Sequence, residues 1–131
     1  MRAETTPREI TTMTPPSLRI AVLGIGNMGD PIARRLHQAG HQVHAWNRTR
    51  AKAEPLAALG IAVHTTAAEA VQGADRVVSL LENGTVVEQV LFERGAAQAM
   101  RPGALLIDMA SIQPREARDH AARLDEMGLS H

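Results

Sequence analysis

Residues 18–31 read LRIAVLGIGNMGDP, and the interpretation of the whole chain starts from this stretch. The aliphatic run at residues 20–23 is typical of a central parallel strand that is buried on both faces. Gly24, Gly26 and Gly29 follow with the spacing G-x-G-x-x-G. In a dinucleotide site the first glycine allows a sharp turn, the second lets a pyrophosphate approach the backbone, and the third brings the helix close to the sheet. The stretch therefore predicts a strand, a phosphate-binding turn and a helix N-terminus.

The glycines alone are weak evidence, since a glycine turn can join any strand to a helix. A second strand, predicted at residues 42–46, ends on Asn47, Arg48 and Thr49, about twenty residues beyond the glycines, where such folds read the adenosine ribose. A carboxylate there would bind the 2′-hydroxyl of NAD, whereas a guanidinium can bind a 2′-phosphate through two hydrogen bonds. Arg48 therefore favours NADP(H) as the cofactor over NAD(H). The alternative is that Arg48 is a solvated loop cation.

Strand and helix signals alternate along the rest of the chain. Apolar periodicity predicts helices at residues 29–39, 50–59, 67–71, 85–92, 96–100 and 114–127, and aliphatic runs predict strands at residues 42–46, 61–64, 76–81 and 104–108. Thr66 and Glu69 have the spacing of a capping box. Pro55 favours a start near Ala53 for the helix that contains it, because proline is tolerated best in a first turn.

This alternation predicts right-handed βαβ units and a Rossmann-type α/β fold, that is, a doubly wound parallel sheet with strand order 3-2-1-4-5. The usual sixth strand would follow Leu129, close to the last residue of the sequence. We therefore expect a fold truncated before the sixth strand, with residues 105–107 exposed along an unpaired edge. The apolar side of the last helix is expected to consist of four residues, Ala117, Ala121, Leu124 and Met127.

The composition excludes several classes of protein. The chain has 131 residues, the size of one domain, and 14 basic residues balance 14 acidic ones, which argues against a nucleic-acid partner. No cysteine is present, so thiol chemistry and disulfides are excluded. No apolar run approaches the length of a membrane span, and a cytoplasmic location is expected. Residues 1–17 are expected to form a disordered leader before a dinucleotide-binding domain at residues 18–131.

Several segments resemble the β-hydroxyacid dehydrogenases, which include 3-hydroxyisobutyrate dehydrogenase and tartronate semialdehyde reductase and are related to 6-phosphogluconate dehydrogenase. The resemblance lies in GIGNMGDPIA at residues 24–33, NRT at 47–49 with Lys52, VVEQVL at 86–91, and the segment that ends in DMASIQP at 108–114. Ala110 replaces a serine that is usual in the last of these signatures. The resemblance extends from Leu18 to Gly128.

The resemblance implies a role for each matching position. The pyrophosphate would lie against the glycine turn, which comprises Gly24, Ile25, Gly26, Asn27, Met28 and Gly29. The 2′-phosphate would be held by Asn47, Arg48 and Thr49, and the nicotinamide ribose would be bordered by Leu81, Glu82 and Asn83. Ser111 would contact the nicotinamide or the substrate carboxylate. Judged from the residues alone, Ser111 is an ordinary cap or turn serine.

The resemblance also implies that a part of the enzyme lies outside this sequence. The family's catalytic lysine belongs to a helical domain, and Lys52, the only lysine here, belongs to the NRT segment instead. We therefore expect no catalytic residue in this chain, an inactive fragment of an oxidoreductase that interconverts a small 3-hydroxy acid and its aldehyde or keto acid, and no hydroxy acid binding without the missing domain. The alternatives are a stand-alone NADP-binding or interaction module and the cofactor domain of an imine reductase-like enzyme.

The remaining polar residues suggest no further site. His37, His41 and His44 are close in sequence, but Gly40 interrupts the helical face and no third ligand has a defined spacing, so no metal site is predicted. Glu88 and Glu116 are interpreted as solvated charges on helices.

Overall fold

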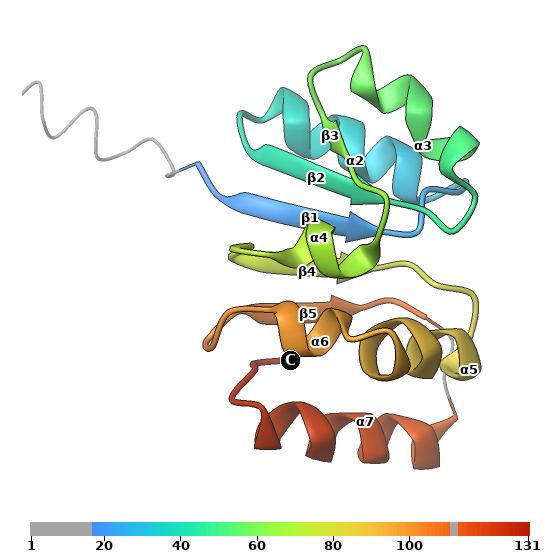
Figure 1. Cartoon of the computed structure of the whole chain (residues 1–131), viewed down its shortest axis with the longest axis vertical. Helices are drawn as coiled ribbons and strands as arrows, with labels where there is room; N and C mark the ends of the chain where they lie inside the picture. The colour runs from blue at the N-terminus through green and yellow to red at the C-terminus, as the bar shows by residue number, and fades with distance from the viewer. Residues whose placement is uncertain (1–16, 111–112) are drawn as a thin grey trace, which may run out of the picture.

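Five parallel strands form one sheet in the order β3-β2-β1-β4-β5 (Figure 1). The computed structural model describes residues 17–110 and 113–131, so Ser111 and all but the last residue of the expected leader lie outside the described residues. The strands are β1 (Arg19–Leu23), β2 (Gln42–Trp46), β3 (Ala62–Val63), β4 (Arg76–Ser79) and β5 (Leu105–Asp108). The helices are α2 (Gly29–Gln38), α3 (Arg50–Ala57), α4 (Ala67–Val71), α5 (Gly84–Val87), the π-helix η1 (Glu88–Glu93), α6 (Ala96–Ala99) and α7 (Pro114–Glu126). The predicted fold class and strand order are confirmed.

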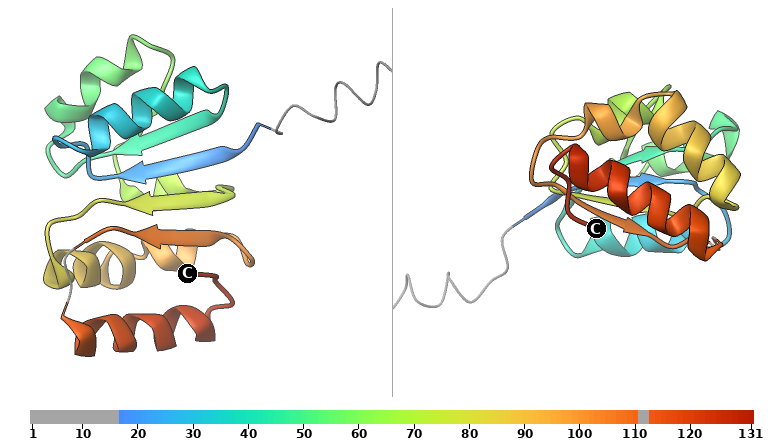
Figure 2. Two further views of the ribbon diagram at one scale, coloured as in Figure 1. Left: turned by 180° about the vertical axis from the view of Figure 1, so that it is seen from behind. Right: turned by 90° about the horizontal axis from the view of Figure 1, so that it is seen from below.

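Helices cover both faces of the sheet, as the view from below in Figure 2 shows. β1 lies at the centre, and its side chains alternate between two separate apolar cores because successive strand residues point to opposite faces. Ile20 and Val22 pack toward α2 and α3, whereas Ala21 and Leu23 pack toward α4, η1 and α6. The buried run of β1 is thus explained by burial on both faces.

Ser17 is attached to the sheet region. Its hydroxyl donates a hydrogen bond of 2.9 Å to the carbonyl oxygen of Gly40, and the backbone N–H of Leu18 donates to Nδ1 of His41 at 3.0 Å. Ser17, expected at the end of the leader, is thus connected to the loop that precedes β2.

Helix α3 begins at Arg50, and the predicted start near Ala53 is wrong. Pro55 lies inside the helix, where it removes one backbone hydrogen bond. Ala53 and Leu56 are fully buried against the sheet, so packing of this face compensates for the lost bond and holds the helix together from its first turn.

The segment after β4 is not the single α-helix that the sequence predicted. Asn83 caps α5, its side-chain oxygen accepting from the N–H of Val86 at 3.0 Å. The helix then widens into the π-helix η1, which ends with a bond of 2.8 Å from the N–H of Arg94 to the carbonyl oxygen of Gln89. Apolar residues set at helical spacing cannot distinguish an α-helix from a short π-helix, whose hydrogen bonds span four and five residues respectively.

The outer edge of β5 is partly covered. Ser130 forms a parallel bridge with Leu105, and the N–H of Leu106 donates to the Ser130 carbonyl oxygen at 2.8 Å. Leu106 is buried in the same core as Leu124 and Leu129, which corrects the expectation that residues 105–107 are exposed together, while Ile107 is 40% exposed.

Only part of the predicted apolar side of α7 is buried. Leu124 is buried, but Ala117 is exposed, and a cavity of about 310 Å³ lies between the helix and β5. This space separates the middle of α7, from Ala117 to Leu124, from the outer side of β5. Among the described residues, no helix has both the length and the apolar character that crossing a membrane requires.

Candidate functional site

A cleft of about 190 Å³ opens at the carboxyl ends of β1, β2 and β4. The chain connections reverse direction between β1 and β4, and ligands of open α/β sheets bind at this kind of switch point. The cleft is lined by the turn after β1, the loops after β2 and β4, and the helical segment that follows, namely Gly24, Ile25, Gly26, Trp46, Asn47, Arg48, Thr49, Lys52, Leu80, Leu81, Glu82, Val86, Gln89, Val90 and Arg94.

The three glycines of the turn differ in their surroundings. Gly24 has a φ of +100°, and an added Cβ would lie 2.6 Å from the carbonyl oxygen of Leu80. An added Cβ on Gly29 would overlap the carbonyl oxygen of Gly24. At Gly26 a Cβ would meet no atom within 4 Å, and the residue is exposed at the cleft. Two glycines are therefore required by the chain itself, and the third leaves space beside the backbone.

Asn47 connects the turn to the loop after β2. Its side-chain oxygen accepts from the N–H of Ile25 at 2.8 Å, and its side-chain nitrogen donates to the carbonyl oxygen of Thr49 at 2.9 Å. The N–H of Gly24 donates to the Trp46 carbonyl oxygen at 2.8 Å. The amide thus holds two walls of the cleft together, and both of its polar atoms are engaged within the protein.

Arg48 and Glu82 form an ion pair between the loops after β2 and β4. Nη2 of Arg48 lies 2.8 Å from Oε1 of Glu82, and the two side chains are 59% and 70% exposed. Both residues line the cleft. The guanidinium of Arg48, which the sequence predicted to bind a 2′-phosphate, is therefore paired with the carboxylate of Glu82 in this structure.

The structure brings most of the predicted site residues together. Eight line the cleft, namely Gly24, Ile25, Gly26, Asn47, Arg48, Thr49, Leu81 and Glu82. Asn27, Met28 and Gly29 continue into α2 and are not among the lining residues, and Asn83 is engaged as the cap of α5.

Sequence reasoning missed one wall of the cleft. Val86, Gln89, Val90 and Arg94 come from α5, η1 and the residue after it. Apolar periodicity predicted a helix at residues 85–92, which contains the first three of these residues. The packing of that segment beside the carboxyl ends of the strands places it at the cleft.

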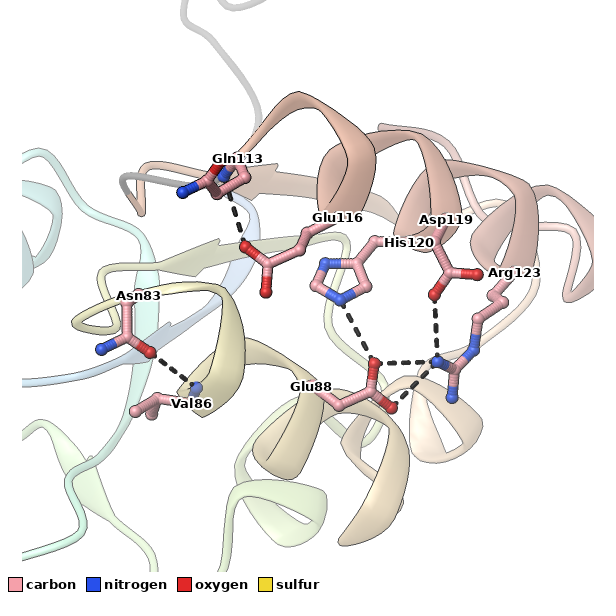
Figure 3. A network of polar contacts seen from close by, with 8 residues as sticks. All are labelled: Asn83, Val86, Glu88, Gln113, Glu116, Asp119, His120 and Arg123. Carbon is pink, nitrogen blue, oxygen red and sulfur yellow. Dashed lines mark hydrogen bonds and ion pairs between the residues drawn. The ribbon is translucent and has the colours of Figure 1, made fainter.

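A second polar cluster joins α7 to η1 (Figure 3). Nη1 of Arg123 donates to both carboxylate oxygens of Glu88 at 2.9 Å and to Asp119 at 3.3 Å, and Nε2 of His120 lies 3.3 Å from Glu88. The guanidinium also lies 3.8 Å from the centre of the Phe92 ring. The hypothesis that Glu88 is a solvated charge is wrong, because tertiary packing brings α7 against it.

Within the described residues, Glu88, Asp119 and His120 are the one group of three potential metal ligands whose atoms lie within 4.8 Å of one another. The Arg123 guanidinium already contacts both carboxylates, so this group has a positive partner from the protein. Its evident role is to anchor α7.

Glu116 is likewise engaged in local structure and is not simply solvated. Its Oε1 accepts from the N–H of Gln113 at 3.3 Å, which caps the start of α7 (Figure 3). A Cβ on Gly84 would lie 2.5 Å from the same carboxylate, so Glu116 also packs closely on the start of α5.

Two histidines pair at the outer part of the sheet. Nδ1 of His44 lies 2.8 Å from Nε2 of His64, and the rings stack with centres 5.0 Å apart. Burial, followed by the nearby Arg19 and His64, lowers the pKa of His44 to about 4, and burial also lowers the pKa of His64. Both rings are therefore neutral at physiological pH.

The fold and the cleft define a dinucleotide-binding domain of the Rossmann type. Residues 19–131 match the family described as the NAD binding domain of 6-phosphogluconate dehydrogenase. The chain belongs to this family. Its class of ligand is therefore the nicotinamide dinucleotides.

The chain is similar in sequence and in structure to 3-hydroxyisobutyrate dehydrogenases. The chain is 38% identical over 110 residues to a Mycobacterium tuberculosis protein named as a probable 3-hydroxyisobutyrate dehydrogenase, a match that covers 84% of this chain and 37% of the relative. A solved structure of 3-hydroxyisobutyrate dehydrogenase from M. tuberculosis with L-serine matches with a TM-score of 0.81 and 36% identity over 88% of this chain and 39% of that one. The chain therefore spans less than two fifths of the length of these relatives.

Imine reductase structures are similar as well. The imine reductase of Myxococcus stipitatus in complex with NADP+ matches with 30% identity and a TM-score of 0.78, over 88% of this chain and 39% of that one. A variant of that enzyme in complex with NAD+ matches over the same shares with 28% identity and a TM-score of 0.80. Related structures thus contain both dinucleotides.

Proposed function

We propose that this chain is the NADP(H)-binding part of an oxidoreductase that interconverts a small 3-hydroxy acid and its aldehyde or keto acid. The observation that carries the choice of NADP(H) is the position of Arg48, whose guanidinium lies at the cleft directly after β2. This is where the adenosine ribose is read in such folds, and the loop offers no carboxylate of its own at residues 47–49 to bind a free 2′-hydroxyl.

The remaining residues take complementary roles in the proposal. Gly24, Ile25 and Gly26 face the pyrophosphate, and the adjoining Asn27, Met28 and Gly29 lead into the N-terminus of α2, whose dipole favours phosphate. Thr49 lies beside Arg48, and Asn47 positions both loops. The loop of Leu81, Glu82 and Asn83 borders the nicotinamide ribose, while the Glu82 side chain extends from that loop to Arg48. Ser111 contacts the nicotinamide or the substrate carboxylate.

In this proposal the reaction also uses residues outside the 131-residue sequence. The dinucleotide provides or accepts the hydride, and this chain holds and orients it. The hydroxy acid, suggested by the dehydrogenases that the chain resembles, is bound in our proposal only together with a further domain carrying the catalytic lysine. The 131-residue chain alone is expected to bind dinucleotide without turning over hydroxy acids.

An imine as the reducible substrate is the second candidate, and a stand-alone binding module is the third. Imine reductases with bound dinucleotide share this fold at up to 30% identity among those compared. The DMASIQP segment favours the hydroxyacid class, because it is similar to that family's substrate-side signature. Assays of a longer protein that contains this sequence, with 3-hydroxy acids and with cyclic imines, distinguish the two enzymes.

Calorimetric titration of the chain with NADP+ and with NAD+ tests the cofactor. Arg48→Ala removes the charged partner of the 2′-phosphate, and such bonds contribute about 1.5–3 kcal/mol. We therefore expect the variant to lose about ten- to a hundredfold of its NADP+ affinity while NAD+ affinity changes little. Arg50→Ala is the matched control, since Arg50 pairs with Glu54 and does not line the cleft. Equal affinities for both dinucleotides in the unaltered chain would refute the preference.

A further inference from the structure

We propose that Glu82 tunes the discrimination between NADP(H) and NAD(H) by competing with the 2′-phosphate for the Arg48 guanidinium. The inference rests on the proposed function and identifies a residue that lowers the preference created by Arg48. It starts from the ion pair of 2.8 Å between the two side chains.

The ion pair spans the switch point of the sheet. Arg48 follows β2 and Glu82 follows β4, and these two strands flank β1 on opposite sides. Neighbouring strands lie about 4.8 Å apart, so the two loops start roughly 10 Å from each other. The side chains therefore reach toward one another across the carboxyl end of β1, where the glycine turn begins at Gly24. Because both residues line the cleft, a dinucleotide bound there contacts the Arg48–Glu82 pair.

The charges make the competition specific for one ligand. A 2′-phosphate needs the guanidinium and is repelled by a carboxylate in contact with it. The 2′-hydroxyl of NAD is uncharged, so it neither requires the guanidinium nor is repelled by the carboxylate. Glu82 consequently weakens binding of the phosphorylated ligand more than binding of its counterpart.

Exposure keeps the competition modest. Both side chains are more than half exposed, and exposed ion pairs are weak and screened by solvent. A bound 2′-phosphate can therefore displace Glu82. Lys52 also lines the cleft, so a positive charge other than Arg48 is present to attract the phosphate during the exchange.

Calorimetric titration of Glu82→Gln with NADP+, NAD+ and adenosine 2′-monophosphate tests the proposal on the 131-residue chain. Loss of the carboxylate is expected to raise the affinities for NADP+ and adenosine 2′-monophosphate about two- to fivefold relative to the affinity for NAD+, as suits an exposed ion pair. In an Arg48→Ala background the same substitution should raise these affinities by less, because the contested guanidinium is gone and only direct repulsion of the phosphate by the carboxylate is removed.

Glu54→Gln is the matched control. Glu54 is also an exposed carboxylate paired with an arginine, so the change in net charge is identical, but it does not line the cleft. An unchanged ratio of NADP+ to NAD+ affinity in Glu82→Gln, an equal gain for both dinucleotides, or the same gain in Glu54→Gln overturns the inference. The proposed function fails separately, if the unaltered chain binds neither dinucleotide or if Arg48→Ala leaves the preference intact.

Discussion

Gly24, Gly26 and Gly29 show at the residue scale how one residue type serves two purposes. Gly24 adopts a positive φ, and Gly29 lies so close to Gly24 that neither tolerates a side chain. Gly26 has open space where its side chain would be. The fold therefore requires the outer two glycines, whereas the open space at the middle one suits the proposed approach of a pyrophosphate.

This difference predicts opposite behaviour for two variants. Gly26→Val should keep the thermal midpoint within a few degrees and abolish dinucleotide binding, because the side chain occupies the cleft. Gly29→Ala should lower the free energy of unfolding by about 1–3 kcal/mol through overpacking. Calorimetric titration and thermal unfolding followed by circular dichroism measure the two effects. Normal binding by folded Gly26→Val would mean that the dinucleotide lies elsewhere.

At the scale of elements, contacts between different helices and strands hold η1, α7 and β3 in place. The π-helix η1 buries Val90, Leu91 and Phe92 in succession, and the Glu88–Arg123 pair attaches α7 to it. The outer strand β3 has only two residues, and the ring pair of His44 and His64 adds a side-chain contact beside it. This sheet edge therefore depends on two neutral imidazoles.

The histidine pair predicts a loss of stability in mild acid. The pKa of His44 in the folded chain is about 4, below the unfolded value of 6.5, so the unfolded state binds the proton more readily. The stability that neutral His44 contributes is thus present above pH 6.5 and is lost as the pH falls from 6.5 toward 4. Because the ring is only half-buried, solvent screening limits this loss to about 1 kcal/mol.

Urea unfolding at several pH values measures this dependence. His44→Gln should flatten the curve between pH 6.5 and 4, whereas His37→Gln, a histidine outside the pair, should leave it unchanged. A curve of the same slope in His44→Gln would show that other groups cause the acid sensitivity.

At the scale of the whole molecule, the two sheet edges differ. β3 is short, and within residues 17–110 and 113–131 the outer side of β5 is paired through the bridge to Ser130 alone. Ile107 and Met109 are 40% and 49% exposed at that side of the fold. A partly unpaired strand with exposed apolar side chains is a template for pairing with another chain.

We therefore expect the 131-residue chain to self-associate with rising concentration. Ile107→Lys should shift the molar mass measured by light scattering toward the monomer, because an edge lysine opposes strand pairing. Leu59→Lys replaces an equally exposed apolar residue in the loop after α3 and should have little effect. A monomer at all concentrations, or equal effects of the two substitutions, would contradict the role of β5.

The sequence by itself determined the order and type of most elements. The glycine spacing and the aliphatic runs predicted the sheet order, and the capping box of Thr66 and Glu69 is present, with the Glu69 N–H 3.1 Å from the Thr66 hydroxyl oxygen. Eight of the predicted site residues line one cleft, because strand ends can be located from sequence and parallel strands end at the same edge.

Only the tertiary structure decided how these residues are used. Asn47 is engaged with Ile25, Arg48 is paired with Glu82, and Glu88 contacts Arg123, across separations of 22, 34 and 35 residues. Helical and strand periodicities extend over one element and carry no information about such distant partners. The start of α3 at Arg50 and the π-helical form of η1 were likewise visible only in the structure. Local patterns therefore placed the site, and packing between distant segments assigned its contacts.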